Sequence, residues 1–445
     1  MTPKTFDRGI HPAYHKELTF SLATEKAPLP KRVVIPLGQH VGAPCRPVVK
    51  KGDIVEAGQL IGEAVSFVSA PVHASIGGKV KEVAPHPHPG GGRMMAVVID
   101  GDGTDREWSG GADADLDSMD PDQLRKRIRE AGIVGMGGAA FPTAVKLSPP
   151  QGKVVDTVIL NGCECEPYLS ADHRLMLEEP EKVLSGLKLI MRATGAKDGC
   201  VALEDNKLDA LEALRKAAEA MAPEVRFATL KTKYPQGAEK ILIYTVLGRK
   251  VPLGKLPFDA GVVVNNVGTA VAIYEALGHG KPLIERVLTV SGNGVATPKN
   301  LKVRIGTSFA EVLALCGGIT EAEGLEREVL NGGPMMGVAQ TSLDVPVVKG
   351  TSGITVLEAR EIKPAEFGPC IRCARCVETC PMGLMPYRIA DMGRLSLTSR
   401  FKGWDGVSCI ECGCCAFICP PKRPLVQWIR VGKIKLREAE QEASA

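Results

Sequence analysis

Aromatic residues make up only 4% of this 445-residue chain, and no apolar run approaches the roughly 18–20 residues that cross a bilayer. The N-terminal stretch MTPKTFDRGIHPAYHKEL lacks the apolar core of a secretory signal peptide. These absences predict a chain that folds in the cytoplasm, where it can still dock on a membrane-embedded partner. The net charge is only +4, and no long basic run with interleaved aromatics occurs, so we expect no nucleic-acid partner.

The rest of the composition is typical of a soluble multidomain protein. Hydrophobic residues make up 44% and charged residues 24%, which is enough for ordinary cores, and the length suggests roughly two to four domains. Glycine (49 residues) and proline (32 residues) are plentiful, which favours turns and compact β modules. Fourteen cysteines in a reducing compartment indicate metal ligation or catalysis before disulfides.

The N-terminal region contains short strands separated by glycine and proline. The expected strands cover 32–36, 41–49, 59–66, 72–74, 79–83 and 95–100. The phrase VKKGDIVEAGQLIGEA followed by SAPVHASIGGKVKEV resembles the two halves of a barrel-sandwich (biotinyl/lipoyl-like) domain, which we place at 1–105. Such domains carry a modifiable lysine at a hairpin tip, whereas this tip reads SAPVHAS, so a structural role is favoured over a carrier role. The acidic, glycine-rich residues 106–122 are expected to be a linker.

Helices and strands alternate in the next region, which predicts an α/β core at 123–283. Pro121 begins an amphipathic helix, and the β-branched run Val154–Leu160 indicates a buried parallel strand. The further elements expected are helices at 181–194, 208–221, 237–247 and 269–277 and strands at 200–204, 225–232 and 261–265. This pattern predicts a sheet covered by helices on both faces.

A second β-rich region follows at 284–360. It contains RVLTVSGNG, LKVRIG and EVLNGGPMMG with a short helix, SFAEVLALCGG. The segment resembles a soluble-ligand-binding β-grasp (SLBB-like) module, for which a spacer role is favoured over a ligand site.

Eight of the cysteines form two runs with one spacing, C-x₂-C-x₂-C-x₃-C-P. In proteins with two such runs, three cysteines of each run bind one [4Fe–4S] cluster and the fourth serves the other cluster. Zinc is the alternative, but tetrahedral zinc sites usually use pairs of C-x₂-C. One cluster is therefore assigned to Cys370, Cys373, Cys376 and Cys419, and the other to Cys409, Cys412, Cys415 and Cys380.

The two cluster runs lie in a predicted α-helical, ferredoxin-like domain at 361–425. Cys414 falls off the spacing, so we interpret it as a bystander. The charged helical tail at 426–445 has basic residues around Trp428, which fits a solvated helix face or docking on a partner or an anionic membrane surface.

The loop GMGGAAFPT at 135–143 contains G-x-G-x-x-A, which is a weak signal here because a helix rather than a strand precedes it. Its glycines expose backbone N–H groups that suit a phosphate or a flavin edge, although a tight helix–strand connection is an alternative. Polar residues also follow two strands, in NGCECEP and NNVGT, and a third polar cluster is YPQGAE. The carboxyl ends of parallel strands are where ligands bind in open α/β sheets.

The segments GMGGAAFPTAVK, VILNGCECEP, YPQGAEK and VNNVGT resemble the flavin- and NADH-binding subunit of respiratory complex I. With the barrel-sandwich domain and two cluster runs, the chain more closely resembles the RnfC family, the C subunits of Rnf ion-translocating ferredoxin:NAD⁺ oxidoreductases, from GIHP at 9–12 to the second run. Two departures stand out: Cys163 replaces an aspartate of complex I, and YPQGAE keeps only one of two glutamates, Glu239.

The resemblance implies FMN bound in a cleft formed by the glycine-rich loop and the two strand ends. Glycines of the loop would line phosphates and flavin, Phe141 would stack on adenine, Lys146 would meet a phosphate, and Glu166 and Glu239 would face the nicotinamide. The implied cofactor-binding residues are Gly135, Gly137, Gly138, Phe141, Lys146, Asn161, Glu166, Tyr234, Glu239, Asn265, Asn266 and Thr269.

The function implied is that of an enzyme subunit of an ion-translocating NADH/ferredoxin oxidoreductase. It would be peripheral to the bacterial inner membrane on its cytoplasmic side, with other Rnf subunits as partners and ferredoxin as an indirect one. NADH gives up two electrons as a hydride while each cluster accepts one, so a flavin is needed between them. The alternative is an electron-transfer scaffold with two clusters and no active nucleotide site.

Overall fold

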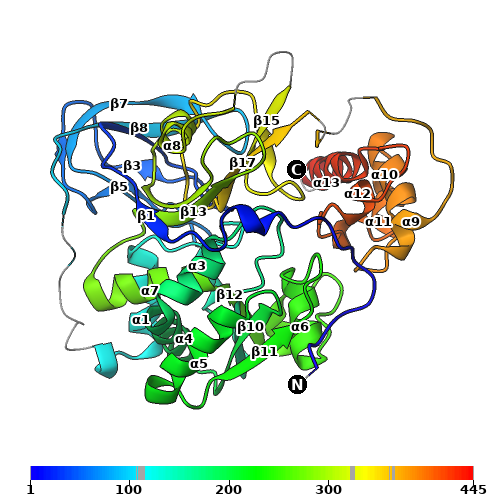
Figure 1. The fold of residues 1–445 in the computed structure, drawn as a ribbon, viewed down its shortest axis with the longest axis horizontal. Coiled ribbons are helices and arrows are strands. Elements are labelled where there is room, and N and C mark those ends of the chain that lie inside the picture. The colour runs from blue at the N-terminus through cyan, green and yellow to red at the C-terminus, as the bar shows by residue number, and fades with distance from the viewer. Residues whose placement is uncertain are drawn as a thin grey trace.

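The computed structural model describes residues 2–106, 108, 116–320, 326–359, 361–362 and 366–443. A barrel, an α/β core, a second β module and a helical C-terminal domain are arranged around one another (Figure 1). This confirms the predicted fold class. Of the linker expected at 106–122, residues 107 and 109–115 lie outside the described residues. A short 3₁₀ helix, η2 (Leu116–Ser118), follows, and the first helix of the core already begins at Pro121.

The N-terminal barrel consists of two small sheets, ordered β2-β8-β7-β4 and β3-β5-β6. Their strands are β2 (Arg32–Pro36), β3 (Arg46–Pro47), β4 (Ile54–Val55), β5 (Leu60–Glu63), β6 (Val72–His73), β7 (Gly78–Pro87) and β8 (Arg93–Gly101). Val33 and Ile35 alternate into the core and are fully buried. The strand expected at 41–49 shrinks to β3 because Gly42 has a φ of +112° and Pro44 has no N–H to donate.

The core contains a parallel sheet with the order β11-β10-β9-β12. Its strands are β9 (Thr157–Asn161), β10 (Asp198–Glu204), β11 (Arg226–Leu230) and β12 (Val262–Asn266). Its helices are α1 (Pro121–Glu130), α2 (Thr143–Lys146), α3 (Ala171–Glu178), α4 (Pro180–Thr194), α5 (Leu208–Met221), α6 (Glu239–Leu247) and α7 (Val267–His279), with the 3₁₀ helix η3 (Pro257–Ala260).

Helices cover both faces of this sheet, as predicted. Val158 and Leu160 of β9 pack in the cluster that includes α4, α5 and α7, whereas Ile159 packs on the opposite face with residues of α6. After β9, the next two strands, β10 and β11, are added on one side of β9, whereas β12 is added on the opposite side of β9. The sheet therefore has its topological switch point between β9 and β12, which is where ligands bind in such folds.

The second β module is a six-stranded sheet ordered β1-β14-β13-β17-β15-β16. Its elements are β1 (Thr24–Lys26), β13 (Glu285–Ser291), β14 (Lys299–Arg304), α8 (Phe309–Leu315), β15 (Arg327–Asn331), β16 (Val338–Gln340) and β17 (Gly353–Glu358). β1 comes from the N-terminal segment and pairs in parallel with β14. The N-terminal segment thus ties this module to the rest of the chain.

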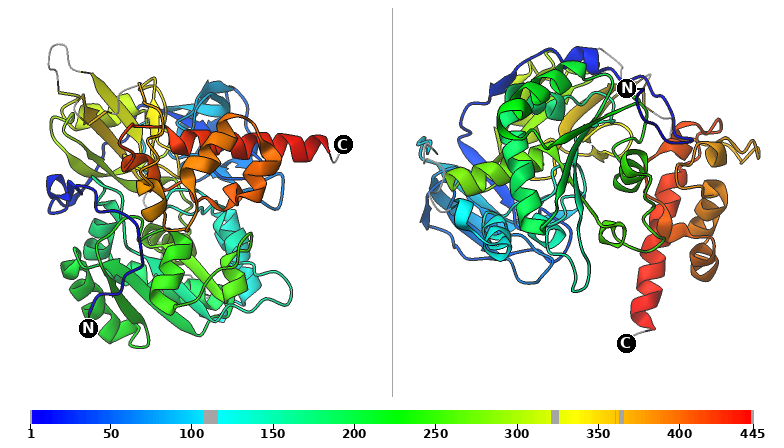
Figure 2. Two further views of the ribbon diagram at one scale, coloured as in Figure 1. Left: turned by 90° about the vertical axis from the view of Figure 1, so that its right-hand side faces the viewer. Right: turned by 90° about the horizontal axis from the view of Figure 1, so that it is seen from below.

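The C-terminal domain is a compact group of short helices around one long helix. The elements are α9 (Arg375–Glu378), α10 (Pro386–Arg394), α11 (Thr398–Gly403), η4 (Gly406–Ser408), α12 (Cys414–Phe417) and α13 (Leu425–Glu442). α10 and α13 touch backbone to backbone, since a Cβ on Gly393 would stand 2.2 Å from the carbonyl oxygen of Trp428. The end of α13 projects away from the molecule (Figure 2). No helix in the described part of the chain is long and apolar enough to cross a membrane.

The first residues of the chain run over the surface between these domains (Figure 1). Lys4 pairs with Leu230, the last residue of β11, and Ile10 pairs with Tyr234. A 3₁₀ helix, η1 (Lys16–Leu18), then precedes β1. The N-terminal segment therefore contacts the core before it joins the second β module.

Candidate functional site

The glycine-rich loop lies at the switch point between β9 and β12. Asn161 and Asn266, at the ends of these strands, are paired in register. The loop is tied to α7 by a hydrogen bond of 2.9 Å from the Met136 N–H to Thr269 Oγ1. A Cβ on Gly137 would stand 3.2 Å from Asn266 Cβ. The structure thus brings the loop and both strand ends together, as the sequence predicted.

Backbone and side-chain polar groups at this place are available to a ligand. Gly137 and Gly138 are exposed, and Gly138 has a φ of +125° with open space where a side chain would stand. Asn265 is 3% exposed, yet its Nδ2 has no hydrogen-bond partner among the described residues, and the same holds for Thr143 Oγ1 and Gln236 Oε1. Unpaired buried polar atoms are costly, so these residues fit a bound group with polar edges such as FMN.

Other predicted cofactor residues are hydrogen-bonded around the loop and the strand ends. Asn161 donates from Nδ2 to the Gly237 carbonyl at 2.8 Å, and Asn266 donates to Asp172 Oδ2 at 2.6 Å. Within the loop, the Gly135 N–H donates to the carbonyl of the half-buried Phe141 at 2.8 Å. These contacts fix the loop and the strand ends relative to the neighbouring segments.

Two predicted ligand-binding charges are paired with each other. Lys146, at the end of α2, forms an ion pair of 2.6 Å with Glu239, the first residue of α6. Both side chains are partly exposed, and an anionic ligand group would compete with Glu239 for the ammonium.

Glu166 lies against the second β module. Its carboxylate accepts hydrogen bonds from the N–H groups of Met335 at 3.1 Å and Met336 at 2.8 Å. Burial raises the pKa of Glu166 to about 7, despite these hydrogen bonds. The glutamate predicted to face the nicotinamide therefore also fixes the loop that follows β15.

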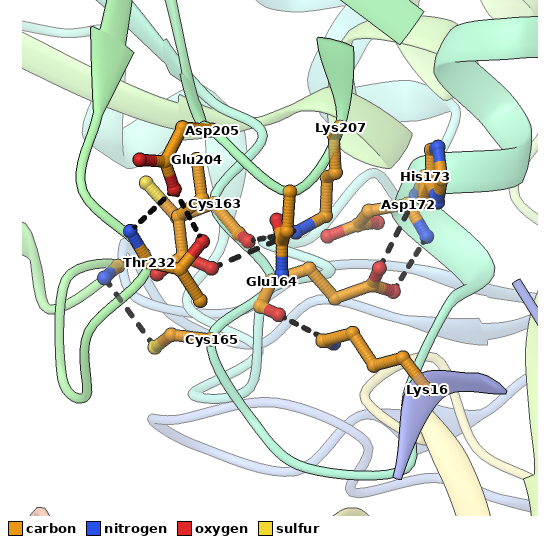
Figure 3. Close-up of polar contacts among 12 residues, drawn as sticks. Lys16, Cys163, Glu164, Cys165, Asp172, His173, Glu204, Asp205, Lys207 and Thr232 are labelled. Atoms are coloured by element: carbon orange, nitrogen blue, oxygen red, sulfur yellow. Dashed lines mark hydrogen bonds and ion pairs between the residues drawn. The ribbon is translucent and has the colours of Figure 1, made fainter. Parts of the chain in front are cut away.

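A network of buried charges lies next to the NGCECEP loop (Figure 3). Its lysines and glutamates belong to no sequence motif, so they could not be identified from the sequence. Lys16 donates to the carbonyls of Glu164 at 2.7 Å and Glu166 at 3.0 Å. Lys207, 1% exposed, donates to the Cys163 carbonyl at 2.7 Å and pairs with the buried Glu204 at 3.6 Å. Burial lowers the pKa of Lys16. Two ammonium groups thus hold the carbonyls of the loop in place.

The two cysteines of this loop are part of its packing. Cys163 is fully buried, and burial raises the pKa of its thiol well above the ordinary value. Cys165 is half-buried, and its Sγ accepts a hydrogen bond from the Gly237 N–H at 3.4 Å. Both cysteines are therefore packing residues of the loop.

The second cysteine run borders a small, mostly apolar cavity. The cavity is lined by Cys380, Cys409, Cys412 and Cys415, together with the off-spacing Cys414 and apolar residues such as Ile389 and Val426. Burial raises the pKa of Cys415, and the thiols of Cys409, Cys412 and Cys380 raise it further. The thiols around this space are those assigned to one cluster, including the one from the first run.

The thiols of the other set are neighbours too. Burial raises the pKa of Cys376, and the thiols of Cys419, Cys370 and Cys373 add to the shift. No three Cys, His, Asp or Glu side chains in the described ranges are placed to hold one metal ion. Two sets of four soft thiolate donors are the donor chemistry of iron–sulfur cubanes.

Tyr234 occupies a different place from the other predicted cofactor residues. It is 1% exposed, and its hydroxyl donates to the carbonyl of Cys412 at 2.7 Å. Its loop also carries Gly237, whose carbonyl accepts from Asn161. The same loop therefore touches the candidate cleft on one side and the second cysteine run on the other.

Known proteins match the chain along its length. Family models described as the RnfC barrel sandwich hybrid domain, the Nuo51 FMN-binding domain and the SLBB domain match residues 4–104, 128–275 and 287–339. In the H2-reduced state, the crystal structure of an NAD+-reducing [NiFe]-hydrogenase aligns with a TM-score of 0.50 at 20% identity, over 76% of this chain and 68% of that one. This last likeness concerns the fold alone.

Curated relatives cover nearly the whole chain. The C subunit of the proton-translocating ferredoxin:NAD(+) oxidoreductase complex of Clostridium ljungdahlii is 47% identical over 99% of this chain and 96% of its own length. The Na(+)-translocating counterpart of Acetobacterium woodii is 49% identical over 96% of each chain. The C subunit of the ion-translocating oxidoreductase complex of Rhodobacter capsulatus is 43% identical over 86% of this chain and 73% of its own. The chain therefore belongs to the RnfC family.

Proposed function

We propose that this chain is the NAD(H)-side subunit of a membrane-bound Rnf-type complex. It passes electrons between NAD(H) and other redox subunits through FMN and two [4Fe–4S] clusters, and the complex couples this transfer to ion translocation. The proposal is supported most by one observation: a single loop, 234–237, connects the cleft at the switch point to the thiol-lined cavity. The relatives named as components of ferredoxin:NAD(+) oxidoreductase complexes support the same function.

The cleft residues would hold the flavin by their polar atoms. The backbone of Gly137 and Gly138 and the unpaired Nδ2 of Asn265 would donate to it, and Lys146 would leave Glu239 for a phosphate. Bound FMN would supply hydride acceptance from NADH and one-electron release to a cluster. Glu166 and Glu239 would border the nicotinamide side, while Asn161, Asn266 and Thr269 keep the cleft open.

The two thiol sets would each hold one cubane with crossed fourth ligands. The more exposed of the two clusters would face the other subunits. Ferredoxin would exchange electrons with this chain only through those subunits. We place the chain on the cytoplasmic side of the bacterial inner membrane, held there by its partner subunits, because NAD(H) is cytoplasmic.

The test is anaerobic addition of NADH to protein reconstituted with FMN, iron and sulfide. Flavin absorbance should bleach, and Glu166→Ala should slow the bleaching by about tenfold because the nicotinamide side loses its shape. Glu219→Ala, on the exposed face of α5, is the matched control and should bleach like the unmodified protein. Intact clusters without any bleaching would instead favour a cluster scaffold with no nucleotide site. The ion pair between Lys146 and Glu239 supports that alternative, because it already neutralises the lysine that would meet a phosphate.

A further inference from the structure

Residues Arg8–Ile10 and Tyr234 join the core to the C-terminal domain, and we call them the clasp. Ile10 and Tyr234 exchange two backbone hydrogen bonds, of 2.9 Å and 3.0 Å. Both side chains are buried, in one apolar cluster with Cys412 and Cys414. The N-terminal segment is thus bonded to the loop that borders the flavin cleft.

The clasp also contacts both cysteine runs. The Gly9 N–H donates to the Thr379 carbonyl at 3.0 Å, and Arg8 Nη1 lies 3.4 Å from the Cys380 carbonyl. On the other run, the Tyr234 hydroxyl donates to the Cys412 carbonyl. Cys380 and Cys412 belong to the same thiol set, so the clasp contacts one cluster site through two different segments of the chain.

Steric fit makes the clasp intolerant of change at Gly9. Its φ is +77°, and a Cβ there would stand 2.6 Å from the Tyr234 carbonyl oxygen and 2.9 Å from the Phe6 ring. Even a methyl group would therefore push the N-terminal segment away from Tyr234.

We propose that the clasp sets the distance between the flavin cleft and the cluster site of Cys380, Cys409, Cys412 and Cys415, and thereby the rate of electron transfer between them. This inference rests on the proposed function. NADH supplies two electrons, the two clusters accept one each, and the first of these transfers crosses the clasp. The clasp residues are positioning residues, since they touch the Cys412 and Cys380 carbonyls rather than reacting atoms.

The Tyr234 hydroxyl has a second effect, on the potential of that cluster. Hydrogen bonds and burial around ligating sulfurs tune cluster potentials. Without the hydroxyl, the buried Cys412 carbonyl keeps its full negative dipole beside a site that becomes more negative on reduction. Tyr234→Phe should therefore lower the potential of this cluster and leave that of the other cluster unchanged.

The experiment uses the full chain with both cofactors, mixed anaerobically with NADH while flavin and cluster absorbance are followed separately. In Gly9→Ala, flavin bleaching should keep its rate while cluster reduction slows by about tenfold. In Tyr234→Phe, cluster reduction should slow by about threefold. Redox titration followed by EPR gives the cluster potential independently of turnover.

Two matched controls separate the clasp from general strain. Gly52 has a φ of +97° in the barrel with nothing near its Cβ position, so Gly52→Ala tests the left-handed strain alone. Tyr244, 39% exposed on α6, provides Tyr244→Phe. Hydrogen exchange in protein without cofactors adds a readout of structure, since Gly9→Ala should speed exchange at the Ile10 and Tyr234 amides and Gly52→Ala should not.

The outcomes are distinguishable. Cluster reduction and cluster potential that match the unmodified protein in both clasp variants would overturn the inference. If NADH bleaches no flavin even in the unmodified protein, the proposed function fails instead, and the cluster potentials and amide exchange still decide whether the clasp acts on the cluster site.

Discussion

The two cysteine runs share one spacing and one backbone shape but lie in opposite surroundings. Arg372 and Glu411 occupy equivalent positions with φ of 57° and 55°, and Ala374 and Gly413 are equivalent with φ of 60° and 84°. Yet Cys370 and Cys373 are exposed, whereas Cys412 and Cys415 are buried.

The cause of this difference lies outside the runs. Met335, Tyr234 and Ile10 cover the second run, and Glu411 is bound to α13 through Arg430 at 2.8 Å and Lys433 at 2.7 Å. By contrast, residues 370–375 of the first run are exposed, and Ile371 among them is 61% exposed. The same motif thus forms two different sites. The inner site, facing the core, consists of Cys380, Cys409, Cys412 and Cys415, and the outer site, facing solvent, consists of Cys370, Cys373, Cys376 and Cys419. The domains around the runs decide which of the two sites is covered.

The largest effect should come from removing the crossed ligands. Cys380→Ala lies in the first run but should abolish the inner cluster, while Cys419→Ala lies in the second run and should abolish the outer one. Each variant should lose about half of its iron, and EPR of the reduced protein should show which signal remains. Loss of the outer signal in Cys380→Ala would show that each run binds its own cluster.

The reactivity of the thiols in protein without clusters tests whether the two runs differ in exposure. Alkylation should be at least about tenfold faster at Cys370 and Cys373 than at Cys412 and Cys415, because the buried pair reacts only after local opening. Mass spectrometry of peptides after timed quenching measures the four rates. Equal rates would mean that the inner run is not covered in solution.

Two substitutions at equivalent positions of the two runs distinguish the effect of backbone conformation on stability from the effect of the surrounding residues. Gly413→Ala should destabilise the protein by about 2 kcal/mol, because its Cβ would stand 2.7 Å from the Met335 carbonyl oxygen. The reverse change, Ala374→Gly, relieves a left-handed alanine and should change stability by at most about 1 kcal/mol in the favourable direction. Thermal unfolding measures both, and a similar response at the two positions would refute the difference in cover.

The smallest effect concerns pH. Burial raises the pKa of Glu166 to about 7, so the folded protein holds a proton that the unfolded chain has released above its ordinary pKa near 4.5. This contribution to stability is present at low pH and is lost as pH rises through about 7. Glu166→Gln should remove it, so the variant should gain about 1 kcal/mol over the unmodified protein between about pH 6 and about pH 8. A difference in stability between the two proteins that does not change with pH would mean that the Glu166 carboxyl is exposed to water.

Local sequence signals predicted much of the fold. Pro121 begins α1, where Asp120 and Gln123 form a reciprocal capping box, and the predicted helix 208–221 matches α5. The short helix α3 was missed because its buried residues carry little amphipathic pattern over eight positions. Its N-terminus depends instead on Glu164, which accepts from the Asp172 N–H at 2.7 Å.

The candidate site was predictable where it follows strand ends and cysteine spacing. The contacts between domains were not, because no periodicity or spacing reports them. Tyr234 stood in a polar cluster, yet its hydroxyl reaches a carbonyl 178 positions away. Lys16 likewise carried no signal, although its ammonium holds the loop at Glu164 from 148 positions away. Such pairings depend on how the domains dock.

The most direct test of the whole account is metal, sulfide and flavin analysis of anaerobically prepared protein, combined with EPR after reduction. We expect about eight iron atoms and about eight sulfides per chain, one FMN, and two distinct signals from reduced cubanes. Stoichiometric zinc without inorganic sulfide would contradict the account, since neither thiol set would then carry electrons.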